Sequence, residues 1–179
     1  MYRGLSISLQ GRRMAVSVAA PERHGDRMIY FGIIAMIFAG DFFIKNHMER
    51  TLEEGEEKEK LNGFLLLRKH HNKGAFLNAG QKRQAAVAAV SVLLTIGVAA
   101  VFALSLGMQG NRMLKAGLSM LLGGAFSNTY DRLKRKYVVD YFSFHVKWKR
   151  LARIVFNLSD FGIILGALAV ALSAGRMAD

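Results

Sequence analysis

Apolar residues along the chain gather in four long blocks, whereas the helices of soluble proteins carry a narrower apolar stripe. The blocks occupy residues 28–45, 85–107, 113–130 and 154–175. A helix needs about 20 mostly apolar residues to cross a bilayer, so each block predicts a membrane-spanning helix. The block at 85–107 contains no charged residue and gives the strongest signal. The pattern therefore predicts an all-α polytopic membrane protein with four transmembrane helices.

Two longer segments connect these blocks. Residues 46–84 begin with the acidic run ERTLEEGEEKEK, which is helix-like and predicts a solvated face. The rest of this segment has short apolar runs broken by Asn-Gly and Lys-Gly, which predict small strands and turns. Residues 131–153 are basic and rich in aromatic side chains, a combination typical of the interface between lipid and water.

The ends of the chain are short and polar. Residues 1–27 form a basic leader without a signal-peptide apolar stretch of useful length, and we expect this leader to be a disordered cytoplasmic tail. The alternative is a start at Met28, which opens the first apolar block. Residues 176–179 form a tail. Four spans place both termini on one side of the membrane. The two longer loops hold most of the 25 Lys and Arg residues, so the positive-inside tendency favours these loops in the cytoplasm.

Composition excludes several kinds of site. The chain has no cysteine, which excludes disulfides, thiolate nucleophiles and cysteine metal sites. A formal net charge of +12 would favour nucleic-acid binding in a soluble protein. In a membrane protein the same charge favours contact with anionic lipid head groups. Because the apolar blocks independently indicate a membrane protein, we expect membrane lipids as partners and no nucleic acid.

Four aspartates within or beside the apolar blocks are the candidates for chemistry. Asp41 and Asp160 lie inside predicted spans. Asp131 and Asp140 lie at or just beyond the end of the third span. An ionised Asp inside a bilayer is costly, so an intramembrane acid is a functional candidate by default. Structural ion pairs are the alternative, because Asp131 is next to Arg132 and Asp41 precedes Lys45 by one helical turn.

A pair of carboxyl groups is the strongest chemistry that these residue types offer. Two Asp side chains in one pocket cannot both ionise at low cost, so one keeps its proton while the other acts as a base. Such a pair can activate water and protonate a leaving amine, and nearby Asn side chains can hold the carboxylates or bind an oxyanion. Asp160 has no basic neighbour within a helical turn, and Asn157 lies on its face. Pairing Asp140 with Asp160 requires a loop to fold back over the fourth span.

Two other features have plainer interpretations. Gly123 and Gly124, like the spaced Gly162 and Gly166, predict close approach between helices. The adjacent histidines at 70 and 71 point apart on a strand, so the sequence predicts no metal site there.

Five short motifs follow one another between residues 28 and 175. They are DFFIK (Asp41, Lys45), NKGAF (Asn72), GGAFSNTYDR (Gly123, Gly124, Asn128, Asp131, Arg132), VVDY (Asp140) and FNLSD (Asn157, Asp160). In this order and spacing, on a chain with four apolar blocks, they resemble the motifs of the lipoprotein signal peptidases. These are the type II signal peptidases of bacteria, a family of intramembrane aspartyl peptidases.

The resemblance implies that Asp140 and Asp160 form the catalytic dyad, and that further motif residues bind substrate or support the site. Those residues are Asp41, Lys45, Asn72, Gly124, Asn128, Asp131, Arg132 and Asn157. It implies four transmembrane helices, a small extracytoplasmic β-cradle from the first loop and a short interfacial helix from the second. It implies no metal and no organic cofactor.

The activity that the resemblance implies is removal of signal peptides from diacylglyceryl-modified prolipoproteins, by cutting on the N-terminal side of the lipidated Cys. It also implies a bacterial cytoplasmic-membrane protein whose site faces the extracytoplasmic side, which contradicts the charge count; we expect a monomer. Two alternatives stay open. One is a small membrane transport subunit that uses intramembrane Asp residues, and the other is an inactive paralogue that binds lipidated peptides without cutting them.

The sequence departs from the family pattern beside several motif residues. Ser127 stands where Gly is usual, and Ser159 stands where Ala is usual. The motif around Asn72 has one Ala fewer, and Arg135-Lys136 stands where a Gly is usual. These departures leave both members of the dyad in place, and they bear on substrate preference and loop geometry.

Overall fold

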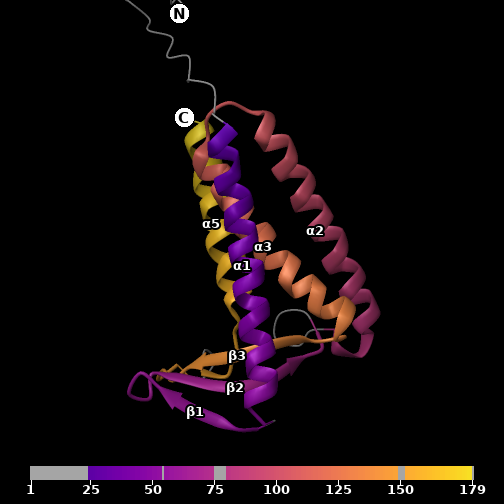
Figure 1. The fold of residues 1–179 in the computed structure, drawn as a ribbon, viewed down its shortest axis with the longest axis vertical. Coiled ribbons are helices and arrows are strands. Elements are labelled where there is room, and N and C mark those ends of the chain that lie inside the picture. The colour runs from indigo at the N-terminus through magenta and orange to yellow at the C-terminus, as the bar shows by residue number, and fades with distance from the viewer. Residues whose placement is uncertain (1–23, 54, 75–79, 149–151, 179) are drawn as a thin grey trace, which may run out of the picture.

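The computed structural model describes residues 24–53, 55–74, 80–148 and 152–178. These residues form long helices that run side by side, with a small sheet across one end of them (Figure 1). The helices are α1 (His24–Thr51), α2 (Gln84–Gly107), α3 (Arg112–Lys134) and α5 (Leu158–Ala178). Helix α1 begins and α5 ends at the end of the molecule away from the sheet (Figure 1).

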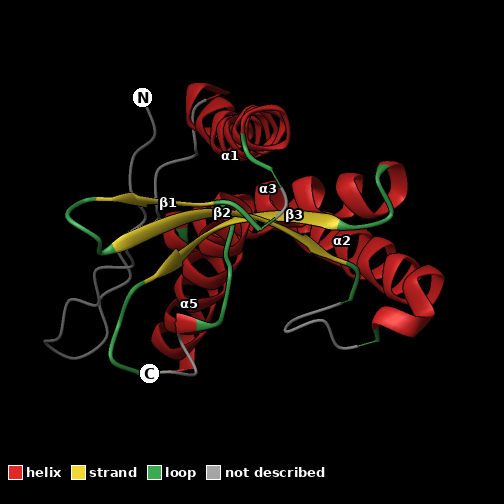
Figure 2. Cartoon of the chain, turned by 90° about the horizontal axis from the view of Figure 1, so that it is seen from below, coloured by secondary structure: helices red, strands yellow, loops and turns green. Residues whose placement is uncertain are grey.

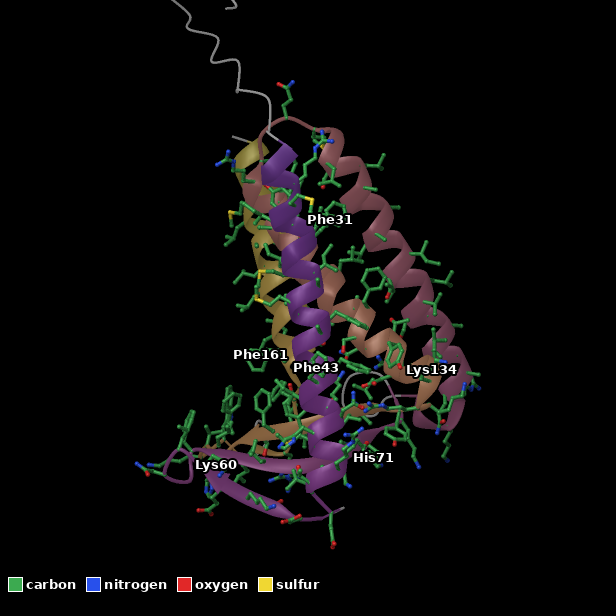
Figure 3. All side chains as sticks on the ribbon, in the orientation of Figure 1. Phe31, Phe43, Lys60, His71, Lys134 and Phe161 are labelled. Carbon is green, nitrogen blue, oxygen red and sulfur yellow. The ribbon has the colours of Figure 1, made fainter. Side chains whose placement is uncertain are left out.

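Three helices among the described residues are long and apolar enough to cross a membrane. They comprise Arg27–Thr51, Gln84–Gly107 and Leu158–Gly175. The expected mostly helical membrane fold is confirmed at this level, and the crossing of the membrane by α3 stays a prediction. Figure 3 agrees with this division, because the sides of the helices carry mostly carbon while nitrogen and oxygen atoms gather around the sheet.

Helix α3 is central, because it packs against α1, α2 and α5. Glycines permit its close contact with α5. A Cβ on Gly166 would lie 2.6 Å from the carbonyl oxygen of Gly117, and one on Gly124 would collide with the carbonyl oxygen of Ser159. The close helix packing predicted for Gly124, Gly162 and Gly166 is therefore confirmed.

The sheet is antiparallel and joins both long loops. Its strands are β1 (Glu57–Lys60), β2 (Leu65–Asn72) and β3 (Val138–Phe144), in the order β1-β2-β3. It spreads across the end of the helices (Figure 2). Strand β2 confirms the strands predicted for the first loop, whereas β3 was not predicted, because its partner lies far away in sequence. The cradle expected from the first loop alone is thus completed by the second.

The helix-like interpretation of the acidic run is wrong beyond Thr51. Helix α1 ends there, Gly55 adopts a φ of +87°, and the last four residues of the run form β1. A left-handed residue interrupts a helix, and pairing with β2 then provides the backbone hydrogen bonds that the helix would have made. The predicted solvated face is confirmed for β1, where every residue is exposed, whereas Leu52 near the start of the run is buried.

Residues 154–157 lead into α5 as extended chain rather than as its first turn. Phe156 bridges to Phe142 of β3, and Phe142 also stacks on Phe161 of α5 with ring centroids 5.5 Å apart. These contacts fix the sheet to the start of α5. Residues 1–23 of the leader lie outside the described residues, whereas its last four residues, 24–27, belong to α1 and are helical rather than disordered. Residues 149–151 of the second loop, from which a short interfacial helix was expected, also lie outside the described residues.

Candidate active site

Asp140 and Asp160 come from different elements and line the same cavity. Asp140 is in β3, and Asp160 is in the first turn of α5. The cavity has a volume of about 900 Å³. Only 3% of Asp140 is exposed. Burial raises the pKa of Asp140 to about 7, and the negative charge of Asp160 adds to the rise. The two carboxyl groups therefore interact with each other.

The register of the sheet places Asp140 beside an amide from the first loop. Asp140 is the partner of His70 across the β2–β3 ladder, and Asn72 lies two positions further along β2. Side chains two positions apart on a strand share a face. The Nδ2 atom of Asn72 accordingly donates to Oδ2 of Asp140 at 3.1 Å. Asn72, which the first-loop motif predicted as a site residue, therefore contacts the acid itself.

Asp160 is held by the cap of its own helix. The backbone N–H of Asn157 donates to Oδ2 of Asp160 at 3.0 Å, and the backbone N–H of Asp160 donates to Oδ1 of Asn157 at 3.0 Å. This reciprocal pair has the geometry of a capping box, which satisfies two N–H groups that the first turn leaves free. The carboxylate also lies at the positive end of the helix dipole.

Two asparagines connect the acids. Nδ2 of Asn157 donates to Oδ1 of Asp140 at 2.7 Å, and Nδ2 of Asn128 donates to Oδ1 of Asp160 at 3.1 Å. Nδ2 of Asn157 also approaches Oδ1 of Asn128 at 3.4 Å. Each carboxyl group thus accepts hydrogen bonds from two different residues, which restricts the orientation of both.

A buried ion-pair cluster lies behind these residues. Lys45 lies 2.6 Å from Asp41 and 3.0 Å from Asp131, and all three side chains are almost completely buried. Nζ of Lys45 also donates to Oδ1 of Asn128 at 2.9 Å. The ion pair considered for Asp41 and Lys45 is therefore present. Asp131 pairs with Lys45 and with Arg135 at 3.4 Å, whereas its sequence neighbour Arg132, considered as its partner, donates to the carbonyl oxygens of Asn128 and Gly74.

Arg132 and Gly124 shape the surroundings of the dyad. Arg132 lines the cavity and donates to the carbonyl oxygens of Asn128 at 3.3 Å and Gly74 at 3.2 Å. Arg132 thereby connects α3 to Gly74, two positions after Asn72. Gly124 contacts the backbone just before Asp160, where a side chain would force α5 away from α3.

The cavity has two chemically different parts. From α2, α3 and α5 it is lined by apolar side chains that include Leu94, Val98, Leu121, Ile163 and Ile164. From the loops it is lined by polar side chains that include Arg68, His70 and Arg153. The acids lie between an apolar helical wall and a polar rim. This arrangement suits a substrate that is apolar on one side of the reacting bond.

Three residues of this region were not predicted as site residues. Tyr141 was assigned to the aromatic interface, yet its hydroxyl donates to Oδ1 of Asp41 at 3.0 Å. Ser127 and Ser159, which were singled out only as departures, both donate to Asp41. Their adjacency to motif residues was the only signal in the sequence. Among the described residues, no group of three or more His, Asp or Glu side chains could hold a metal ion.

The fold is similar to that of two solved bacterial membrane enzymes. One has a TM-score of 0.76 at 19% identity and covers 89% of this chain and 93% of that chain. The other has a TM-score of 0.63 at 18% identity and covers 87% of this chain and 96% of that chain. Together with the apolar helices, this similarity defines a multi-pass membrane protein.

Sequence comparison identifies the family. Residues 33–175 match the family described as Signal peptidase (SPase) II. The lipoprotein signal peptidase of Clostridium novyi (strain NT) is 30% identical over 145 residues, which cover 81% of this chain and 93% of that protein. That of Brevibacillus brevis (strain 47) is 32% identical over 141 residues, which cover 78% and 89%. The chain belongs to the signal peptidase II family and is a peptidase.

Proposed function

We propose that this chain is an aspartyl endopeptidase that removes signal peptides from prolipoproteins, with Asp140 and Asp160 as its catalytic dyad. The observation that carries the proposal is the placement of two carboxyl groups, the buried Asp140 of β3 and the partly buried Asp160 of α5, on one cavity. Membership of the signal peptidase II family supplies the substrate class. The same membership disfavours a transport subunit.

The surroundings of the two acids support different roles for them. Asp140, whose pKa rises to about 7 because of burial first and of Asp160 second, keeps its proton up to neutral pH. Asp160 accepts hydrogen bonds from Asn128 and from the backbone of Asn157, at the positive end of a helix, and these contacts offset part of the cost of burying its ionised form. We therefore assign Asp140 as the acid and Asp160 as the base.

The reaction follows from these roles. Asp160 takes a proton from water as the water oxygen bonds to the scissile carbonyl carbon, and Asp140 gives its proton to the carbonyl oxygen. In the second step the tetrahedral intermediate collapses, its hydroxyl returns a proton to Asp140, and the C–N bond breaks. Asp160 gives its proton to the departing amine. Arg132 lines the same cavity, where its positive charge stabilises the negative charge that develops.

The cavity also supports a particular substrate and orientation. Its apolar wall, formed by α2, α3 and α5, suits a precursor whose lipobox Cys carries diacylglycerol and whose cleaved bond lies on the N-terminal side of that Cys. Anchoring the lipid in the bilayer positions the bond and lowers the entropic part of the barrier. We place the protein in the bacterial cytoplasmic membrane, as a monomer whose four helices span the bilayer and whose sheet lies on the extracytoplasmic side.

A cleavage experiment tests the proposal. The purified protein in detergent is mixed with a diacylglyceryl-modified prolipoprotein, and loss of the signal peptide is followed as a shift on a gel. We expect Asp140→Asn and Asp160→Asn to lower the rate by about a hundredfold or more, since each removes a proton-transfer group. Glu59→Gln, on the exposed strand β1, is the matched carboxyl-to-amide control and should cut normally.

Two results would contradict the proposal. Equal rates for wild type and both dyad variants would exclude an aspartyl mechanism at this site. A wild type that binds the lipidated precursor without cutting it, on a substrate that another type II signal peptidase does cut, would indicate an inactive paralogue.

A further inference from the structure

A network of hydrogen bonds behind the cavity is centred on Asp41, which is completely buried. Its Oδ2 accepts hydrogen bonds from the hydroxyls of Ser127 at 2.6 Å and Ser159 at 2.5 Å, and lies 2.6 Å from Nζ of Lys45. Its Oδ1 accepts from the hydroxyl of Tyr141 at 3.0 Å and from the backbone N–H of residue 158 at 3.1 Å. Oδ2 of Asp41 therefore has three polar partners and Oδ1 has two.

The three side-chain hydroxyls that donate to Asp41 share a position relative to the cavity, because each belongs to the chain neighbour of a residue that lines it. The pairs are Tyr141 with Asp140, Ser159 with Asp160, and Ser127 with Asn128. Asp41 lies on α1, and these donors lie on β3, α5 and α3. A single carboxylate thus connects the elements that supply both acids and the amide that holds Asp160.

Geometry makes such neighbours effective at orienting the site. Consecutive side chains on a strand point to opposite faces, so fixing Tyr141 from behind directs Asp140 toward the cavity. Consecutive side chains on an α-helix point about 100° apart, so fixing Ser159 sets the rotation of the first turn of α5. The same argument applies to α3, where fixing Ser127 sets the direction of Asn128.

The two serines are the distinctive part of this network. They are among the departures from the resemblance noted in the sequence, and both hydroxyls donate to the same oxygen of Asp41. Ser127 is 2% exposed and Ser159 is 0% exposed, so both hydroxyls have been withdrawn from water. Ser127 additionally accepts from Lys45 at 3.2 Å.

We propose that Ser127 and Ser159 are positioning residues for the catalytic dyad, which act through Asp41 to fix α3 and α5 against α1. Through them Asn128 and Asp160 keep the 3.1 Å hydrogen bond that orients the base. The inference rests on the proposed function, because it assigns these residues to the turnover step of that reaction. Neither serine lines the cavity, so neither contacts the substrate.

The test compares cleavage kinetics of the diacylglyceryl-modified prolipoprotein for Ser127→Ala, Ser159→Ala and the double variant. We expect kcat to fall roughly tenfold in the double variant, with KM within about twofold of wild type, because misorientation affects turnover more than binding. The single effects should not multiply, since both hydroxyls act on one oxygen atom.

The pH profile supplies a readout that a purely structural role would not change. The charge of Asp160 contributes to the raised pKa of Asp140. If the hydroxyls hold Asp160 in place, their loss should move the alkaline limb of kcat to lower pH. Ser119→Ala is the matched control, because Ser119 is also fully buried on α3 but donates to the carbonyl oxygen of Lys115 at 2.7 Å.

The possible outcomes separate the two proposals. An active wild type whose double variant keeps its kcat and pH profile would overturn this inference alone. The inference is also overturned if Ser119→Ala lowers Tm as much as the double variant does and lowers kcat by the same factor. Absence of cleavage by wild type would overturn it together with the proposed function. Each single variant leaves Lys45 and the remaining donors on Asp41, so the comparison does not depend on folding of the double variant.

Discussion

At the residue scale, the surroundings of Asp140 predict how activity depends on pH. Burial and the nearby Asp160 raise the pKa of Asp140 to about 7, so this acid is protonated below that pH and loses its proton above it. If Asp140 supplies the proton for catalysis, kcat/KM should fall about tenfold per pH unit on the alkaline side. Initial rates of precursor cleavage across neutral pH check this. A flat profile through pH 7 and above would contradict the assignment.

The hydrogen bond from Asn72 permits a second test of the same acid. Asn72 donates to Asp140 and stabilises its ionised form, which limits the rise of the pKa of Asp140. We expect Asn72→Ala to move the alkaline limb to higher pH and to lower the maximal rate, because Asp140 loses one of its orienting amides. Lys73→Ala, at the exposed neighbouring position, should leave the limb where it is. A shift to lower pH in Asn72→Ala would contradict this role.

Sequence could indicate the acids but not the whole of their support. Asp140 and Asp160 were recognisable because carboxylates beside apolar sequence are costly and followed a family pattern. The contacts of Ser127, Ser159 and Tyr141 with one carboxylate depend on how α1, α3, α5 and β3 come together. No local pattern contains that information, since the contacting residues lie far apart in the chain.

At the element scale, the contact between α3 and α5 should be intolerant of any side chain at its glycines. A Cβ at 124 would collide with the backbone before Asp160, and one at 166 would lie 2.6 Å from the backbone of α3. We expect Gly124→Ala and Gly166→Ala each to destabilise the protein by about 1–3 kcal/mol through overpacking. Gly124→Ala should also lower kcat, because it displaces the start of α5.

A glycine on α2 provides the control for these variants. A Cβ on Gly97 would meet nothing within 4 Å. Gly97→Ala should therefore be neutral or stabilising by up to about 1 kcal/mol, as expected for Gly→Ala within a helix. Thermal unfolding in detergent and cleavage rates check the three variants together. Equal Tm values for all three variants would show that close packing of α3 against α5 does not determine the stability of the protein.

The elements differed in how well the sequence predicted them. The charge-free block at 85–107 matches α2 (Gln84–Gly107) closely, because an uninterrupted apolar run leaves only a helix to satisfy its backbone. Strand β3 was missed, since its alternation is short and its partner β2 lies more than sixty residues earlier. Local propensity also favoured a helix for residues 57–60, and tertiary pairing overrode it.

At the scale of the whole molecule, the charge count and the proposed orientation disagree, and part of the basic charge is paired in the folded loops. Arg68 pairs with Glu57 at 3.0 Å, and Lys58 pairs with Glu56 at 2.9 Å. Nε of Arg135 lies 3.4 Å from Oδ1 of the buried Asp131. Such pairs reduce the excess of free positive charge at the sheet end, although acidic residues weigh little in the positive-inside rule. The orientation therefore has to be measured.

Single cysteines can measure it, because the chain has none of its own. Lys58 on β1 and Lys147 beyond β3 are exposed at the sheet end, and Gln109 is exposed between α2 and α3 at the opposite end. With the sheet outside, a membrane-impermeant maleimide should label Lys58→Cys and Lys147→Cys in cells with an intact inner membrane. It should label Gln109→Cys only after permeabilisation.

The same three positions also decide whether α3 crosses the membrane. Labelling of Lys147→Cys together with Lys58→Cys, but not of Gln109→Cys, requires both α2 and α3 to span the bilayer, which gives four spans with α1 and α5. Labelling of Gln109→Cys alone would place the sheet and the dyad in the cytoplasm, as the charge count predicts. The dyad would then lie on the side of the membrane away from exported precursors, and the proposed substrate would be wrong.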